Sequence, residues 1–109
     1  MTLRLSPLLD SFVAATNGHD ADALTACFVA DGIVHDEGVT HRGHAAIRAW
    51  FEDVVRKYRF GIEVTGVETV NDETILATRV SGEFPGSPIE LHYCLNIGDA
   101  QIRGLSIGD

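Results

Sequence analysis

The longest run of helical periodicity in the chain lies between residues 44 and 58. Its apolar side chains recur three or four positions apart, which places them on one face of an amphipathic helix. These residues are Ile47, Trp50, Phe51, Val54, Val55 and Tyr58. Two pairs of opposite charge, each four positions apart, favour a solvent-exposed face on the other side: Arg48 with Glu52, and Asp53 with Lys57. The pattern predicts one long helix that begins after Gly43.

Two shorter helices are predicted before this one. Ser6 is placed to cap the first helix and Pro7 to occupy its first position, while Asn17-Gly18 ends it. One face of the first helix carries Leu9, Phe12, Val13 and Thr16. Asp20 caps the second helix, whose apolar face consists of Leu24, Cys27 and Phe28.

The remaining segments predict strands. Asp31-Gly32 indicates a turn into a short strand near residues 33–36, and Gly38 a turn into a returning strand over 39–42. After residue 59 four strands are expected, at 60–70, 74–84, 88–97 and 101–107. In the third of these, apolar and polar residues alternate, which is typical of an antiparallel strand with one buried face. Three helices followed by such strands predict an α+β fold, with the helices packed on one face of a mainly antiparallel sheet.

Composition narrows the class of protein. The chain has 109 residues, which suggests a single domain over residues 1–109. Its formal net charge of -8 disfavours nucleic acids and anionic membranes as partners, because their phosphates would be repelled. No apolar run approaches the roughly 20 residues that span a bilayer, and the N-terminal MTLRLSPLLD lacks the pattern of a signal peptide. Two cysteines far apart, Cys27 and Cys94, are expected as free thiols in a cytoplasmic protein.

Three stretches carry a family resemblance: FVADGIVHDEG (28–38), HRGHAAIRAWF (41–51) and GDAQIRGLSI (98–107). With the order of predicted elements, they make the chain resemble the nuclear-transport-factor-two-like, or SnoaL-like, superfamily, which includes ketosteroid isomerase and polyketide cyclases. The resemblance implies a cone-shaped α+β barrel in which helices lie in the concave face of the sheet and leave a pocket at the open end. It also implies a homodimer through the outer sheet face, which would include Glu90, His92, Cys94 and Asn96.

The same resemblance implies a catalytic acid at the end of strand 33–36. Aligned from Asp31, the general base of ketosteroid isomerase falls on Asp36, so that Val34 and Asp36 are expected to face the pocket. The tyrosine that donates to the oxyanion in the isomerase aligns with Phe12, which has no hydroxyl group. The second oxyanion donor aligns near Tyr93, which is either a relocated donor or an ordinary core residue.

A carboxylate in an apolar cavity is a better base than one in water, because burial disfavours its charged form and raises its pKa. We therefore expect a small cofactor-free enzyme of isomerase or cyclase type that transfers a proton on a small hydrophobic carbonyl compound. Asp36 and Tyr93 are the predicted catalytic residues. The predicted ligand-binding residues are Phe12, Val34, Trp50, Leu91 and Leu105.

Two other functions stay open at this point. A domain of this fold could hold a small ligand or a protein without catalysis, which would gain weight if Asp36 were the only polar group in the pocket. The epoxide hydrolases of the superfamily place an arginine between two acids, and Arg79 lies on a suitable strand. However, Ser81 and Ile107 stand where the two acids would be expected. The simpler interpretation of Arg79 is an ion pair across the sheet with Glu63, Glu83 or Glu90.

Several possible metal ligands lie close together in the sequence: His35, Asp36, Glu37, His41 and His44. Side chains alternate in direction along a strand, so the first three of them cannot converge on one point. A zinc site needs three or four ligands around a single position. We therefore expect no metal.

Overall fold

Three helices and two strands share residues 5–58, and four more strands follow. The computed structural model describes residues 5–108. Its helices are α1 (Pro7–Asn17), α2 (Ala21–Ala26) and α3 (His44–Tyr58). Its strands are β1 (Phe28–Asp36), β2 (Val39–Arg42), β3 (Gly61–Val70), β4 (Glu73–Ser81), β5 (Ile89–Gly98) and β6 (Gln101–Gly108). The start of the segment MTLRLSPLLD and both ends of the predicted domain 1–109 lie outside the described residues.

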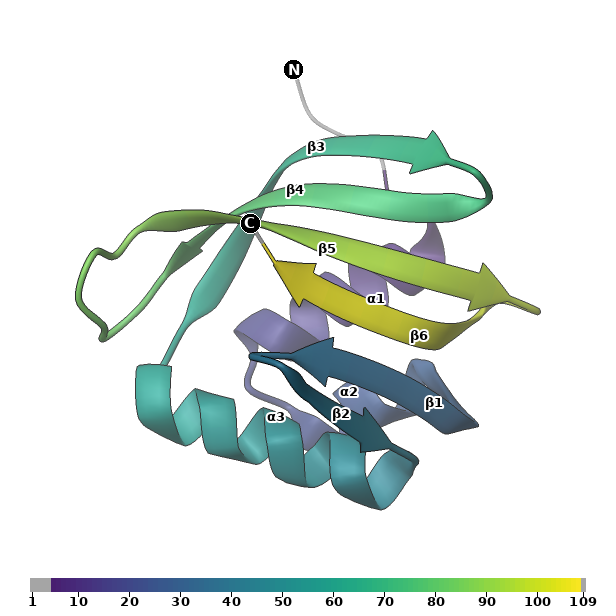
Figure 1. Ribbon diagram of the computed structural model, residues 1–109, viewed down its shortest axis with the longest axis horizontal. Helices are drawn as coiled ribbons and strands as arrows, with labels where there is room; N and C mark the ends of the chain where they lie inside the picture. The colour runs from purple at the N-terminus through teal and green to yellow at the C-terminus, as the bar shows by residue number, and fades with distance from the viewer. Residues whose placement is uncertain (1–4, 109) are drawn as a thin grey trace.

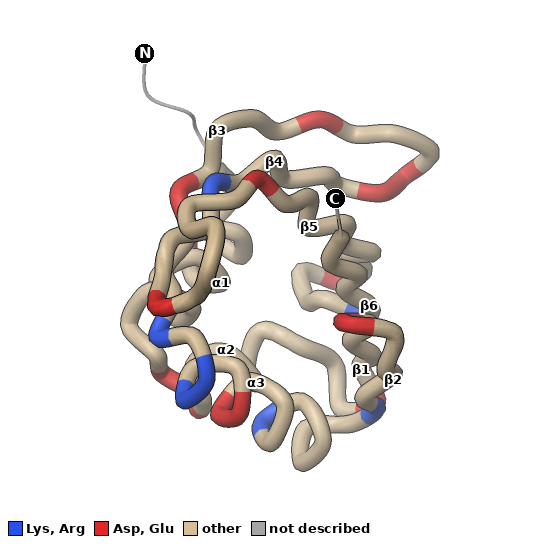
Figure 2. Tube along the Cα trace, turned by 60° about the vertical axis from the view of Figure 1, so that its left-hand side comes forward, with Lys and Arg blue, Asp and Glu red and all other residues tan. Residues whose placement is uncertain are grey.

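The six strands form one curved sheet in the order β2-β1-β6-β5-β4-β3. Neighbouring strands are antiparallel, except that β1 and β6 are parallel. Figure 1 shows the three helices against one face of this sheet, and Figure 2 shows the sheet bending around them from β3 and β4 to β1 and β2. The predicted α+β fold, with helices in the concave face of a mainly antiparallel sheet, is confirmed.

The starts of the first two helices agree with the capping predictions. The Ser6 hydroxyl accepts a hydrogen bond from the Leu9 amide at 3.3 Å, and Pro7 is the first residue of α1. The Asp20 carboxylate accepts from the Ala23 amide at 3.1 Å. These bonds satisfy amide groups that have no partner within the first helical turn.

α3 buries the face that its periodicity predicts, with four buried side chains on it: Ile47, Trp50, Phe51 and Val54. The two predicted ion pairs are present on the opposite face, at 3.9 Å for Arg48–Glu52 and 3.2 Å for Lys57–Asp53. α3 has 15 residues. No helix within residues 5–108 is long and apolar enough to cross a membrane.

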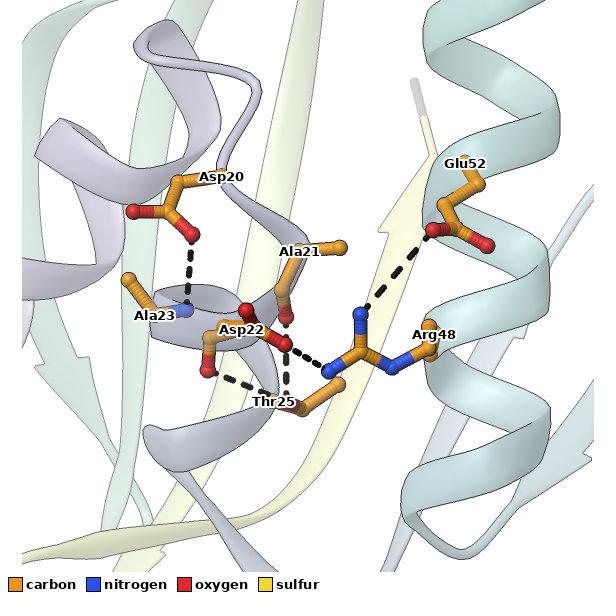
Figure 3. A network of polar contacts seen from close by, with 7 residues as sticks. All are labelled: Asp20, Ala21, Asp22, Ala23, Thr25, Arg48 and Glu52. Atoms are coloured by element: carbon orange, nitrogen blue, oxygen red, sulfur yellow. Dashed lines mark hydrogen bonds and ion pairs between the residues drawn. The ribbon is translucent and has the colours of Figure 1, made fainter.

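Arg48 also connects α3 to α2 at the protein surface. Its guanidinium group contacts the Asp22 carboxylate as well as Glu52, as Figure 3 shows. The Arg48 and Asp22 side chains are 41% and 85% exposed, so solvent screens their attraction. Core packing is stronger, because fully burying one large apolar side chain contributes about 1.5–3 kcal/mol. The core therefore holds the helices to the sheet, and its largest fully buried apolar residues are Phe12, Leu24, Phe28, Val34, Ile47, Phe51, Leu76, Leu95, Ile102 and Leu105.

The predicted boundary between the second helix and the first strand was wrong. α2 ends at Ala26, and Phe28 begins β1 instead of completing the helix face. The cause is a distant partner: Phe28 pairs with Ile102 of the parallel strand β6. Asp31-Gly32 does not turn the chain but lies inside β1, where the pairing with β6 changes register. A Cβ atom on Gly32 would lie 3.1 Å from the Phe28 ring, so this irregularity favours glycine.

The predicted strand 74–84 also ended too late, because β4 stops at Ser81. At Gly82 the chain passes so close to the end of α3 that a Cβ atom there would lie 2.5 Å from the Tyr58 carbonyl oxygen. The Glu83 amide then donates to that same carbonyl at 2.6 Å. Residues 82–88 therefore form a loop held against the C-terminal end of α3.

The end of α1 is fixed to the start of β3 by side chains. The Asn17 amide group donates to the Ile62 carbonyl at 3.0 Å and accepts from the Ile62 amide at 2.7 Å. The His19 ring lies 2.7 Å from the Phe60 carbonyl oxygen, measured from Nε2. These contacts fix the backbone around Phe60, which is one wall of the cavity described below.

The convex side of the sheet, here called the outer face, carries the polar residues of the strand alternation. Arg79 lies opposite Glu63 of β3 and Glu90 of β5. His92 pairs with Ala77, and Cys94 pairs with both Ile75 and Ser106. The outer face is therefore mixed in character, with charged side chains toward its ends, such as Arg79 and Glu73, and half-buried apolar side chains in the middle.

Candidate functional site

A cavity of about 360 Å³ opens between α3, the end of β1, the strands β4 to β6 and the loop 82–88. This volume is within the range of small-molecule sites. The cavity wall is mostly apolar and aromatic, and its polar side chains are few. It is lined by Asp36, Glu37, Trp50, Val54, Tyr58, Phe60, Val80, Phe84, Pro85, Ile89, Leu91, Tyr93 and Ile107.

Asp36 reaches the cavity because of the direction in which β1 ends. Val34 is fully buried on the concave side, and side chains alternate, so Asp36 faces the same way. His35 points to the other side, where its Nδ1 lies 2.9 Å from the Thr40 hydroxyl of β2. The structure thus places Val34 and Asp36 on the face that the family resemblance implied.

One oxygen of Asp36 is held by α3. The Trp50 indole N–H donates to Asp36 Oδ2 at 2.9 Å. Burial raises the pKa of Asp36 and is the largest influence on it. The Trp50 hydrogen bond and the nearby His41 ring oppose this rise in pKa, whereas the Glu37 charge adds to it. The result is a carboxyl group with a raised pKa and with Oδ1 free of any side-chain partner within residues 5–108.

Tyr93 lies in the middle of β5, between Leu76 of β4 and Ile107 of β6. It is only 4% exposed, and its ring packs edge-on against Phe12 with the centroids 6.0 Å apart. Its hydroxyl has no hydrogen-bond partner among the described residues. Every side-chain N or O atom that is fully buried in this part of the chain does have a partner, so the Tyr93 hydroxyl is not fully buried. The hydroxyl therefore opens to the cavity that Tyr93 lines. Burial, and to a lesser extent the Asp36 charge, raise the pKa of Tyr93 and keep it a neutral donor.

The cavity mouth is formed by lining residues that reach solvent, among them Glu37, Tyr58, Phe84, Pro85 and Ile89. The Tyr58 hydroxyl donates to Glu37 Oε1 at 3.1 Å. The Tyr58 and Phe84 rings meet edge-on with their centroids 5.8 Å apart. A carboxylate and two aromatic rings therefore stand together at the mouth.

Of the five predicted ligand-binding residues, the structure places Trp50 and Leu91 in the cavity wall. Phe12, Val34 and Leu105 do not line it, because helix and sheet cover them to 1% exposure or less. Leu105 pairs with Val34 deep in the sheet, whereas Ile107, two positions further along β6, pairs with Tyr93 and lines the cavity.

Other lining residues were missed because they depend on the loop that follows Gly82. Phe84 and Pro85 come to the cavity only because this loop folds back onto the end of α3. Tyr58 was expected as helix core first and pocket lining second, and Ile89 as a strand residue; the spacing of neither residue indicates that it stands at an opening. The available signal was Pro85-Gly86-Ser87-Pro88 between two strands, which predicts a turn but not its direction.

The possible metal ligands point in different directions. The His44 ring donates to the Phe28 carbonyl at 2.9 Å, and His35 bonds Thr40. His41 lies beside Trp50, with ring centroids 6.2 Å apart. Within the described part of the chain, no group of three His, Cys, Asp or Glu side chains could hold a metal ion.

Arg79 lies on the opposite side of the sheet from the cavity. Its neighbours Thr78 and Val80 are buried on the concave face, so Arg79 is exposed on the outer face beside Glu63 and Glu90. An acid–arginine–acid group around a water, as epoxide hydrolases have it, cannot be assembled from Arg79 and Asp36.

Comparisons with known proteins extend over nearly the whole chain. The sequence profile described as SnoaL-like domain matches residues 9–96. One similar solved structure is that of SMa1630, a Sinorhizobium meliloti protein proposed to be a polyketide cyclase. Its sequence is 33% identical to this chain, the alignment covers 94% of each chain, and the TM-score is 0.89. No curated protein matches the sequence.

Two further solved structures share the fold at lower identity. A protein with a ketosteroid isomerase-like fold from Catenulispora acidiphila, solved with trimethylamine, is 19% identical over 97% of this chain and 87% of its own, with a TM-score of 0.84. SalBIII, an epoxide hydrolase/cyclase-like enzyme of pyran ring formation in salinomycin, is 17% identical over 93% and 86%, with a TM-score of 0.80.

Proposed function

The chain belongs to the SnoaL-like domain family, and from this premise we propose that it is a small cofactor-free enzyme of isomerase or cyclase type. It moves a proton on a small hydrophobic carbonyl compound held in the cavity. One observation carries this proposal: the Asp36 carboxyl group and the unpartnered Tyr93 hydroxyl share one apolar cavity. The 33% identity to a proposed polyketide cyclase supports the same reaction type.

Asp36 is the general base in this proposal. Trp50 holds Oδ2, which leaves Oδ1 to take a proton from the carbon beside the substrate carbonyl. The C–H bond breaks, an O–H bond forms on Asp36, and the electron pair moves to the carbonyl oxygen as an enolate. Asp36 then returns the proton to a carbon of the same molecule, so the reaction needs no oxidant or reductant. In a cyclase the enolate carbon would instead attack a second carbonyl of the substrate, and Asp36 would give its proton to the alkoxide oxygen formed there.

Tyr93 supplies the hydrogen bond that the enolate oxygen needs. A positioned base is typically worth about 10²–10⁴ in rate. Losing one donor to a developing oxyanion costs about 10²–10³. The apolar walls contribute by keeping the Asp36 carboxylate poorly solvated, which raises its pKa and makes it a stronger proton acceptor.

A second candidate function is binding without catalysis, and Phe12 favours it. Phe12 stands where the resemblance to ketosteroid isomerase implies a tyrosine donor, and it packs behind Tyr93. The other tyrosine of the cavity, Tyr58, is at the mouth and donates to Glu37. Tyr93 would therefore act alone, and a single donor makes a weaker oxyanion site.

The test is proton–deuterium exchange at the carbon beside the carbonyl, followed by NMR with 2-tetralone and 4-substituted acetophenones that a thermal-shift screen shows to bind. We expect exchange with the unaltered protein and a loss of about 10²–10⁴ in Asp36→Asn, with binding retained. Tyr93→Phe should reduce the exchange rate less, by about 10². Tyr58→Phe is the matched control, since it removes a hydroxyl from the same cavity but not from the reaction. Absence of exchange across several bound ketones would favour the binding function.

A further inference from the structure

The side chains that line the cavity include two acids and, within the described chain, no cation. Asp36 and Glu37 both line it, and none of the lining side chains among residues 5–108 is Lys, Arg or His. Lys57, at the end of α3, does not line the cavity; its ammonium group is 3.2 Å from Asp53, and its charge also acts on Glu37 from outside the cavity wall. A carboxylate, sulfate or phosphate on the ligand would therefore meet repulsion and find no lining cation.

The mouth has the chemistry that binds organic cations. Glu37 Oε1 accepts a hydrogen bond from Tyr58, and this contact holds the carboxylate at the mouth while Oε2 has no side-chain partner in the described chain. The Tyr58 and Phe84 rings stand beside it. A quaternary or tertiary ammonium group is attracted both to a carboxylate and to aromatic faces within about 6 Å.

The inner part of the cavity supports a ligand site independently of these acids. Tyr93 is 4% exposed, and its hydroxyl opens to the cavity without a partner in the described residues. The walls between Tyr93 and the mouth are apolar, including Val80 and Leu91. The ligand that fits this order of groups has an acceptor oxygen at one end and an apolar body behind it.

From this arrangement we infer that the cavity selects a cationic ligand, an apolar carbonyl compound whose other end carries an alkylammonium group. The carbonyl oxygen faces Tyr93, the apolar body lies against the walls, and the ammonium group sits at the mouth between Glu37 and the rings of Tyr58 and Phe84. This inference rests on the proposed function only in taking the cavity as the ligand site, because it concerns binding and not proton transfer.

The experiment compares three acetophenones that differ in one group. The probes are (4-acetylbenzyl)trimethylammonium, its neutral isostere 4′-neopentylacetophenone, and 4-acetylphenylacetate. Dissociation constants are measured by NMR titration at low and at physiological salt. We expect the ammonium ketone to bind about two- to fivefold more tightly than the neutral one, as a cation–π contact at an exposed site would give. The carboxylate should bind at least about tenfold more weakly than the neutral ketone.

Two matched variants locate the selectivity. Glu37→Gln keeps an acceptor for Tyr58 and both aromatic rings but removes the charge, so it should reduce the preference for ammonium while leaving the neutral ketone within about twofold. Glu63→Gln removes one charge from the outer face and should change neither affinity. Equal binding of the ammonium and neutral ketones would overturn the inference, as would a preference that is unchanged in Glu37→Gln. Failure of all three probes to bind at millimolar concentration would also overturn it.

The two hypotheses fail separately. If the ammonium ketone binds preferentially but shows no exchange, cation selection stands and the proton-transfer proposal fails. If exchange occurs on the neutral ketone and no charge preference is found, the proposed function stands and the inference of a cationic ligand is wrong.

Discussion

Replacing Trp50 by phenylalanine should make the Asp36 carboxyl group a weaker acid. The change keeps an aromatic ring on α3 but removes the indole N–H that donates to Asp36 Oδ2 at 2.9 Å. That hydrogen bond is the largest influence that lowers the Asp36 pKa, and it opposes the rise in pKa caused by burial. Without this hydrogen bond, burial and the Glu37 charge still raise the Asp36 pKa, and only the His41 charge and a hydrogen bond from the Glu37 backbone lower it.

The size of the effect follows from the type of bond. A hydrogen bond to a charged group contributes about 1.5–3 kcal/mol to stability. Asp36 is only half-buried, so water replaces part of the lost bond and the lower half of this range applies. An energy of about 1.4 kcal/mol corresponds to a factor of ten in an equilibrium constant. The acid dissociation constant of Asp36 should therefore fall about tenfold in Trp50→Phe.

The assay is a pH titration of the Asp36 side-chain carbonyl carbon by NMR in protein labelled with ¹³C. Val54→Ala is the matched control, because it removes bulk from the same wall of the cavity without removing a donor. Its extra solvent access should leave the Asp36 pKa unchanged or lower it slightly. An Asp36 pKa in Trp50→Phe that is equal to or below that of the unaltered protein would refute the assigned role of Trp50.

Two further predictions concern stability and assembly. Because burial raises the folded-state pKa of Asp36 above the ordinary value of about 3.9, the stability that this group contributes is present below that value and is lost as the pH rises through the folded-state pKa. In Asp36→Asn, the new side-chain oxygen can still accept the hydrogen bond from Trp50. At neutral pH this variant should therefore have the same melting temperature as the unaltered protein or a higher one. A clearly lower melting temperature would indicate that the Asp36 carboxylate is paired and stabilises the fold. We also propose that two copies of the chain pair through the outer face. The middle of this face has half-buried apolar residues that a partner could cover: Ile75, Ala77 and Cys94. A stable interface would bury about 800 Å² on each copy. Analytical ultracentrifugation should find a dimer, and a monomer alone at micromolar concentration would contradict the proposal.

The elements that sequence predicted well are those whose cause is local. α3 follows from the spacing of Ile47, Trp50 and Phe51, and the starts of α1 and α2 follow from caps at Ser6 and Asp20. Each of these signals lies within one or two turns of the element that it controls. The strand alternation of β5 is equally local, and it correctly separates the inward Leu91, Tyr93 and Leu95 from the outer face.

The predictions that failed depend on partners far along the chain. β1 begins at Phe28 because Phe28 pairs with Ile102 of the parallel strand β6. The residues near Phe28 in the sequence give no indication of this distant partner. β4 ends where the backbone passes the carbonyl of Tyr58, and only the position of α3 in the fold brings Gly82 there. Gly32 was taken as a turn signal and Gly82 as part of a strand, whereas close packing is what requires glycine at both positions.

The same distinction decides how much of the candidate site was predictable. Asp36, Tyr93 and Trp50 were singled out from the family resemblance and from apolar patterning, and the structure brings all three to one cavity. Their relation was not predictable, because the hydrogen bond from Trp50 to Asp36 requires α3 to lie across the end of β1. Trp50 was expected to be a wall of the pocket, yet it also sets which carboxylate oxygen is free. The chemistry proposed for Asp36 therefore depends on the packing of a helix whose sequence pattern indicates only a buried face.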